Sequence, residues 1–247
     1  MKRFLLVIGI LFLWVGCAGA DCGADFIRAN SLYKEGQFAQ ALSAYEKLIE
    51  EGHGNSALYY NTANSYYKTG KPALALLNYE RAARWIPRDP DLRINREVVR
   101  SKLEAEEFHP GRAPIAVAAF FLFGSWTVSE SVWCLSGLYF LIFGSFLGMI
   151  FHPPWRRGFS AFAGLCLCIF ILGSVSLTEK IVLKNHVAVV LAEKAPVRFE
   201  PLEGSDINFH VPEGTEIFVM ETREGWDKIM RSDGKTGWMK ADSCEII

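Results

Sequence analysis

The sequence has almost no net charge. Its 247 residues carry 26 lysines and arginines against 27 aspartates and glutamates, so the formal charge is −1. Binding of nucleic acid draws much of its affinity from an excess of basic side chains, and this chain has no such excess. We therefore expect no nucleic-acid partner. Disorder of the whole chain is excluded as well, because 51% of the residues are apolar and the mean hydropathy is +0.16.

Residues that build catalytic or metal sites are scarce. The five histidines are scattered over different segments, with no His-x-x-x-His motif and no local pairing with cysteine at zinc spacing. A Gly-x-Ser-x-Gly nucleophile motif is absent too. We predict a non-enzymatic protein with no catalytic residue, no metal and no cofactor.

The six cysteines offer little redox chemistry. Cys134, Cys166 and Cys168 fall in long apolar segments, where cysteine is an ordinary apolar residue. Cys22 and Cys244 lie outside these segments, at opposite ends of the chain. An oxidising compartment permits a disulfide between them, and the sequence leaves that pairing open.

The first residues, 1–20, have the pattern of a secretory signal peptide. Two basic residues precede an apolar run over 4–15, which is too short to span a bilayer, and the Ala-Gly-Ala at 18–20 supplies a cleavage site. An alternative is lipid attachment at Cys17, although tryptophan stands where such processing usually needs leucine. Secretion predicts that the segment after residue 20 is periplasmic.

Two later segments are long and apolar enough to form transmembrane helices, at 132–151 and 159–179. The loop between them, 152–158, contains Arg156 and Arg157, and positive charge in a short loop marks the cytoplasmic side. We therefore expect two spans in the inner membrane, with the parts before and after them both periplasmic.

The segment at 109–131 precedes the first span as a linker and a short apolar helix. Its apolar stretch, 114–126, is too short to cross a bilayer, which favours an interfacial helix. The alternative is that this stretch crosses, which would place the C-terminal part in the cytoplasm. Thr127 and Glu130 have the spacing of a capping box that opens the first span.

The segment at 21–108 contains an internal repeat. Residues 29–46 and 63–80 align at a period of 34, with eleven of the eighteen pairs identical. That period and pattern are the signature of tetratricopeptide repeats, pairs of helices that stack side by side. Gly36 and Gly70 fall at the turns between paired helices, where backbone freedom is needed. We expect two repeats followed by a capping helix.

Repeats of this kind bind peptides in a groove lined by the first helix of each pair. Asn30, Asn61 and Asn64 fall at groove positions, and asparagine amides can hold an extended peptide backbone. The alternative is that these asparagines are solvated or stabilise their helices.

The C-terminal segment, 186–247, has the alternation and turns of a small β structure. Strands are expected at 186–191, 215–222, 226–230 and 236–239. Its paired Gly-Trp elements, at 225–226 and 237–238, resemble bacterial SH3 domains. Trp226 and Trp238 then belong to the core or rim of the barrel, or form a platform for a ligand.

Together these features predict a multi-domain membrane protein: an all-α tetratricopeptide repeat domain, a two-helix transmembrane hairpin and a small all-β SH3-like barrel. This order resembles the BatE family of the Bacteroides aerotolerance (Bat) operon, through the two repeats, the stretch 87–95, and the residues 225–229 and 234–238.

The resemblance implies a non-enzymatic membrane component that acts with von Willebrand factor A-type Bat membrane proteins and a MoxR-type ATPase, in tolerance of oxygen or envelope stress. The protein would be a membrane-anchored periplasmic scaffold or adaptor. The alternative is a cell-wall sensor that binds peptidoglycan through its SH3-like domain.

Overall fold

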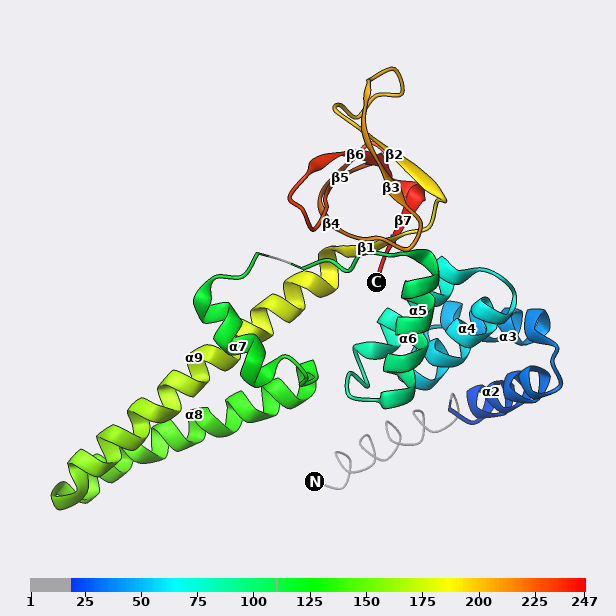
Figure 1. Ribbon diagram of the computed structural model, residues 1–247. Coiled ribbons are helices and arrows are strands. Elements are labelled where there is room, and N and C mark those ends of the chain that lie inside the picture. The colour runs from blue at the N-terminus through cyan, green and yellow to red at the C-terminus, as the bar shows by residue number, and fades with distance from the viewer. Residues whose placement is uncertain (1–18, 110) are drawn as a thin grey trace, which may run out of the picture. The chain divides into compact units, whose positions relative to one another are not determined.

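A computed structural model describes residues 19–109 and 111–247, in two compact units (Figure 1). The first unit holds helices α2 to α6, and the second holds the short turn 86–89 together with everything from Glu104 to Ile247. The expected signal peptide lies outside the described residues except for its last two positions, and so does Cys17.

The first unit consists of helices joined by short turns. Gly36 and Gly70 both have a backbone φ of +79°, a left-handed conformation that glycine adopts without steric cost, so their expected place in the turns is confirmed. Pro72 begins its helix at a position where the missing N–H costs nothing. The helices are α2 (Gly19–Lys34), α3 (Phe38–Glu50), α4 (Ser56–Lys68), α5 (Pro72–Ala83) and α6 (Pro90–Leu103).

Equivalent residues of the repeat occupy equivalent places in this unit. Ala41 and Ala75 are fully buried, which lets paired helices approach closely. Tyr45 and Tyr79 keep only 1% and 2% of their surface exposed. The 34-residue periodicity therefore reflects two helical hairpins with the same internal packing.

The second unit begins with three apolar helices: α7 (Pro114–Phe123), α8 (Val128–Phe151) and α9 (Arg156–His186). The stretches Val128–Phe151 and Pro153–Leu183 are long and apolar enough to cross a membrane. They run side by side, joined by a short 3₁₀ turn, Pro153–Trp155 (Figure 1). The expected capping box at Thr127 and Glu130 is confirmed, with both of its hydrogen bonds present.

The rest of this unit is an antiparallel sheet in the order β3-β2-β6-β5-β4-β1-β7. The four expected strands are confirmed to within a residue or two at their ends, and three more strands join them. The strands are β1 (Val187–Val190), β2 (Lys194–Arg198), β3 (Ile207–Pro212), β4 (Glu216–Arg223), β5 (Trp226–Met230), β6 (Thr236–Lys240) and β7 (Cys244–Ile246).

The expected fold class is wrong. The described residues form a mixed α and β protein, with eight α-helices and a seven-stranded sheet, and do not divide into a tetratricopeptide domain, a hairpin and a small closed barrel. The sheet curls (Figure 1) but does not close, because β3 pairs only with β2 and β7 only with β1. The sheet and the apolar helices also belong to one compact unit.

The sheet packs its core on one face. Fully buried side chains from six strands meet there, among them Val190, Val197, Val211, Ile217, Ile229 and Met239. Such burial contributes about 1.5–3 kcal/mol for each large aliphatic side chain.

A segment preceding α7 runs along β4. The backbone N–H of Glu216 donates to the carbonyl of Glu106 at 2.9 Å, and the N–H of Phe108 donates to the Glu216 carboxylate at 3.2 Å. The Phe218 ring stacks against both Phe108 and His186, with centroid distances of 5.6 and 5.2 Å. These contacts join the last turn of α9 to the sheet.

Candidate functional site

The predicted asparagines take part in a repeated hydrogen-bond pattern in the first unit. The Tyr45 hydroxyl donates to Asn30 Oδ1 at 2.7 Å, and the Tyr79 hydroxyl donates to Asn64 Oδ1 at 2.5 Å. Both pairs are separated by fifteen residues, and each joins the first helix of a hairpin to the second. The carbonyl oxygens of Asn30 and Asn64 therefore hold the hairpins together.

Further amides link successive first helices. Asn61 Nδ2 donates to Asn30 Oδ1 at 2.9 Å, and Asn95 Nδ2 donates to the Tyr60 hydroxyl at 2.8 Å. Asn61 and Asn64 are three residues apart on α4 and so lie on the same side of it. The structure thus brings the three predicted asparagines onto one face, where the Nδ2 groups of Asn30 and Asn64 have no partner among the described residues.

This surface, which we call the Tyr–Asn face, consists of the three asparagines and five tyrosines: Tyr33, Tyr45, Tyr60, Tyr67 and Tyr79. Burial, and secondarily the nearby Tyr33, raises the pKa of Tyr45 to about 12. Burial and the neighbouring phenols Tyr60, Tyr33 and Tyr67 raise the pKa of Tyr79 as well. Tyr45 and Tyr79 therefore stay protonated at neutral pH, so these two phenols offer hydrogen bonds and aromatic surface without charge.

Sequence reasoning singled out Tyr45 and Tyr79 as packing residues but missed Tyr33 and Tyr67. Tyr33 and Tyr67 stand at the same place in the two repeats, exactly one period apart, and that identity was the available signal. Asn95 lies one period after Asn61, in the helix interpreted only as a cap.

The two predicted tryptophans lie on the outer face of the sheet. Trp226 pairs with Lys240, and Lys228 pairs with Trp238, so all four side chains point away from the core residues that alternate with them. Trp226 is half-buried, whereas Trp238 is only 9% exposed. Trp238 is thus covered by its neighbours and is not an open platform.

Cationic side chains cover Trp238. The Arg223 guanidinium and the Lys228 ammonium each lie 5.9 Å from its ring centroid, a distance at which a cation is attracted to the ring. Arg223 also pairs with Glu221, whereas Lys228 forms no ion pair with any residue in the described part of the chain. Arg223 ends β4 and Lys228 lies in the middle of β5, and neither cation was singled out from the sequence.

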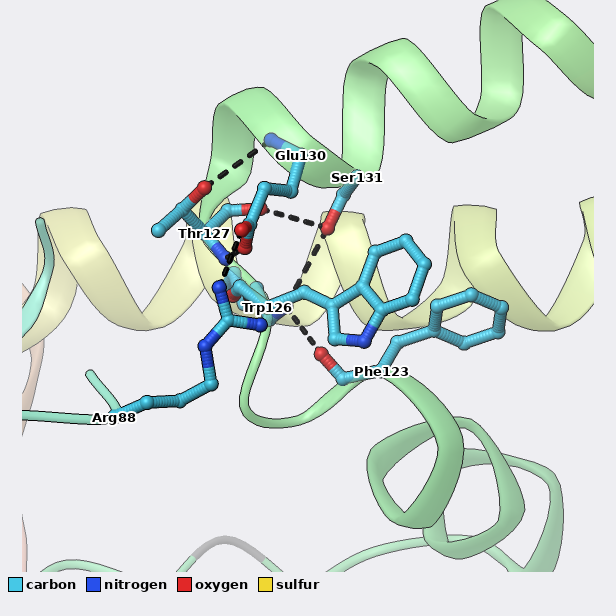
Figure 2. Close-up of polar contacts among 7 residues, drawn as sticks. Arg88, Phe123, Trp126, Thr127, Glu130 and Ser131 are labelled. Carbon is cyan, nitrogen blue, oxygen red and sulfur yellow. Dashed lines mark hydrogen bonds and ion pairs between the residues drawn. The ribbon is translucent and has the colours of Figure 1, made fainter. Parts of the chain in front are cut away.

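A third cluster lies at the turn between α7 and α8. The Lys180 ammonium, from α9, donates to the carbonyls of Phe123 and Trp126 at 2.6 and 2.7 Å, and contacts Ser131 Oγ at 3.5 Å. Phe123, Trp126 and Ser131 gather around this turn (Figure 2). An ammonium has three donors, so the three acceptors match its full capacity.

Ion pairs flank the Lys180 cluster. Glu130 closes the capping box and also pairs with Arg88 of the turn 86–89 (Figure 2). Arg112 Nε donates to Glu179 Oε1 at 2.6 Å, and its guanidinium lies 4.0 Å from the centroid of the Phe120 ring. The second apolar segment was expected to end at residue 179, but α9 continues to His186 and so includes Lys180.

Cys244 is held as a thiol. Burial, together with the nearby Asp227 carboxylate, raises its pKa to about 12, and its Sγ lies 3.6 Å from Asp227 Oδ2. The side chain of Cys22 lies outside the described residues, so the open question of a Cys22–Cys244 disulfide is unchanged. Within residues 19–109 and 111–247, no group of three or more histidine, cysteine, aspartate or glutamate side chains could hold a metal.

No protein-family model and no curated protein matches the chain.

Proposed function

We propose that the protein is a non-enzymatic, membrane-anchored periplasmic scaffold that binds a protein partner at the Tyr–Asn face. The repeated geometry of that face carries the proposal. Two hairpins present the same asparagine–tyrosine pair, and side-chain amides connect one first helix to the next. A regular, uncharged row of amides and phenols suits a peptide segment that offers its own backbone hydrogen bonds.

The anchoring proposal draws on the two apolar helices and their flanking residues. Trp155, 73% exposed, precedes Arg156 and Arg157 at the end of the hairpin where the helices meet. Tryptophan favours the membrane–water interface, and arginines in a short loop favour the cytoplasmic side. With a signal sequence at the N-terminus, this orientation leaves both ends of the hairpin facing the periplasm. A reporter fused to Ile247 tests it: periplasmic activity is expected, and cytoplasmic activity would contradict the topology.

The partner class rests on the residue patterns that resemble the BatE family. We propose von Willebrand factor A-type Bat membrane proteins as partners, with a role in tolerance of oxygen or envelope stress.

The binding experiment uses the full chain in detergent-solubilised membranes, crosslinked and recovered through an affinity tag. The test variant is Tyr33→Ala with Tyr67→Ala, which removes two half-buried rings and leaves the Asn30–Tyr45 and Asn64–Tyr79 bonds in place. Substitution of the asparagines themselves would break those bonds and would test folding as much as binding.

Tyr59→Ala is the matched control, because Tyr59 is also a half-buried tyrosine on α4 but contacts Arg81 instead of this network. We expect loss of a von Willebrand factor A-type partner in the double variant and normal recovery in the control. Equal recovery of that partner by all three proteins would refute binding at the Tyr–Asn face.

A second candidate function, cell-wall sensing, is favoured by the cations around Trp238. Peptidoglycan carries peptide carboxylates, which the cations over the Trp238 ring would attract. Sedimentation of the full chain with purified sacculi tests this function. Arg223→Glu with Lys228→Glu should reduce sedimentation, whereas Lys235→Glu, a control in the β5–β6 turn, should not. Absence of the unaltered chain from the pellet would rule the function out.

A further inference from the structure

Helix α7 is apolar on every side. None of its ten residues is polar or charged, and several large side chains are exposed. Phe121 keeps 88% of its surface exposed, the highest value on this helix. The other exposed side chains are Ile115, Val117, Phe120 and Leu122. A helix that lies on a membrane surface needs a polar face toward water, and α7 has none. At about 15 Å it is also half the length that a crossing requires.

The backbone groups at both ends of α7 suit surroundings without water. The last carbonyls of a helix have no partner within it, and each costs several kcal/mol if it is left unbonded in lipid. Here the Lys180 ammonium donates to the carbonyl of Phe123, the last residue of α7, and to the carbonyl of Trp126 in the turn that follows. At the other end Pro114 stands at the first helical position, where it removes one unbonded N–H.

Helix α7 is continuous with the apolar surface of the hairpin formed by α8 and α9. Ala119 and Phe123 are buried, at 0% and 6% exposure. A side chain placed at Gly173 of α9 would contact Phe123, at 3.7 Å. Gly173 is seven residues before Lys180, or about 10 Å along the helix. The C-terminal end of α7 thus packs against the apolar part of α9, while the carbonyl of its last residue, Phe123, accepts a hydrogen bond from Lys180.

We propose that α7 is immersed in a single leaflet of the bilayer, where acyl chains cover its exposed side and Lys180 fixes its C-terminal end. This inference rests on the membrane anchoring proposed above. It makes α7 a third membrane element that neither crosses the bilayer nor lies on its surface.

Photo-crosslinking from single positions of the full chain in native membranes tests the occupant of this surface. A benzophenone amino acid is placed at Phe121, at Phe140 of α8 and at Phe199 near the sheet. The three residues are all exposed phenylalanines. Adducts are identified by mass spectrometry. We expect phospholipid adducts at positions 121 and 140 and none at 199.

The other outcomes separate the two proposals. Lipid adducts at 140 without any at 121, or adducts between 121 and a protein, would overturn the immersion of α7 while leaving the anchoring intact. Absence of lipid adducts at both 121 and 140 would overturn the anchoring and, with it, the immersion.

A second measurement tests Lys180. Lys180→Met keeps an unbranched side chain but removes all three donors. Hydrogen bonds to charged groups contribute about 1.5–3 kcal/mol, so amide exchange at the C-terminal end of α7 should accelerate about 10- to 100-fold. Lys228→Met, on the sheet, is the control and should leave this exchange unchanged. Unchanged exchange in Lys180→Met would refute the fixing role of Lys180.

Discussion

The sharpest stability prediction concerns the carboxylate of Glu80 in the first unit. It accepts hydrogen bonds from Arg100 at 2.7 Å and from Arg96 at 3.0 Å. The Glu80 and Arg100 side chains are only 11% and 10% exposed, so water screens their interaction weakly. Removal of one partner from a buried ion pair strands a charge and costs about 3–5 kcal/mol. We expect Glu80→Ala to lower the free energy of unfolding by about this amount.

Removal of both charges should cost far less. In Glu80→Leu with Arg100→Met, the charge left over is that of Arg96, whose side chain is 26% exposed and reaches water. Apolar replacements of similar size at the buried pair are often neutral or stabilising. The buried Nε of Arg96 has no hydrogen-bond partner among the described residues, which limits what the ionic arrangement contributes. The double variant should therefore lie within about 1 kcal/mol of the unaltered protein.

Urea-dependent amide exchange, followed on peptides from α2 to α6 of the full chain, measures these changes in the right unit. Lys47→Met is the matched control, because Lys47 pairs with Glu51 across an exposed turn and should cost less than about 0.5 kcal/mol. If Glu80→Ala costs no more than Lys47→Met, the Glu80 pair is not a buried, unscreened interaction and the reasoning fails.

Three further predictions concern single side chains. Gly237→Ala should lower stability by about 1–3 kcal/mol in urea denaturation, because its Cβ would lie 2.5 Å from Val197 Cγ1; Gly204→Ala, in open space, should not. Cys244 should resist alkylation at pH 8.5 in peptide mapping, since its pKa of about 12 keeps it protonated; rapid labelling of the folded chain would contradict this. Tyr45→Phe and Tyr79→Phe should each cost about 0.5–1.5 kcal/mol, and clearly unequal losses would show that the repeated bonds are not equivalent.

Local structure was predictable where one physical rule decided it. The turn glycines, the capping box at Thr127 and the strands at the Gly-Trp elements follow from backbone freedom, helix-end chemistry and alternation. The expectation of a small SH3-like barrel was wrong. Three strands of the sheet, β2, β3 and β7, were not predicted from the sequence. Strand β2 contains Pro196, which argues against a strand in sequence, and β7 has only three residues. Strand β7 also pairs with β1, at the opposite end of the sheet-forming segment, so no local pattern marks it.

The candidate site was likewise predictable only in part. Asn30, Asn61 and Asn64 were expected on one face because they fall at the groove positions of tetratricopeptide repeats. Their bonds to tyrosines fifteen or more residues away depend on how two helices pack, which spacing alone does not show. Lys180 was overlooked for another reason: hydropathy ended the segment at the first charge, whereas the backbone hydrogen bonds of α9 continue past it.

The unbroken passage from α9 into the sheet has a mechanical consequence. Helix α9 has 31 residues, about 46 Å, and β1 begins at the very next residue, Val187. His186 stacks on Phe218 at this junction, so no flexible linker separates the helix from the sheet. A transmembrane helix that is longer than the bilayer is thick accommodates the difference by tilting. If the hairpin spans as proposed, a tilt of about 10° would carry the sheet about 8 Å sideways. Helix α9 and the sheet would then move together, so a change in membrane thickness would produce a sideways displacement of the sheet.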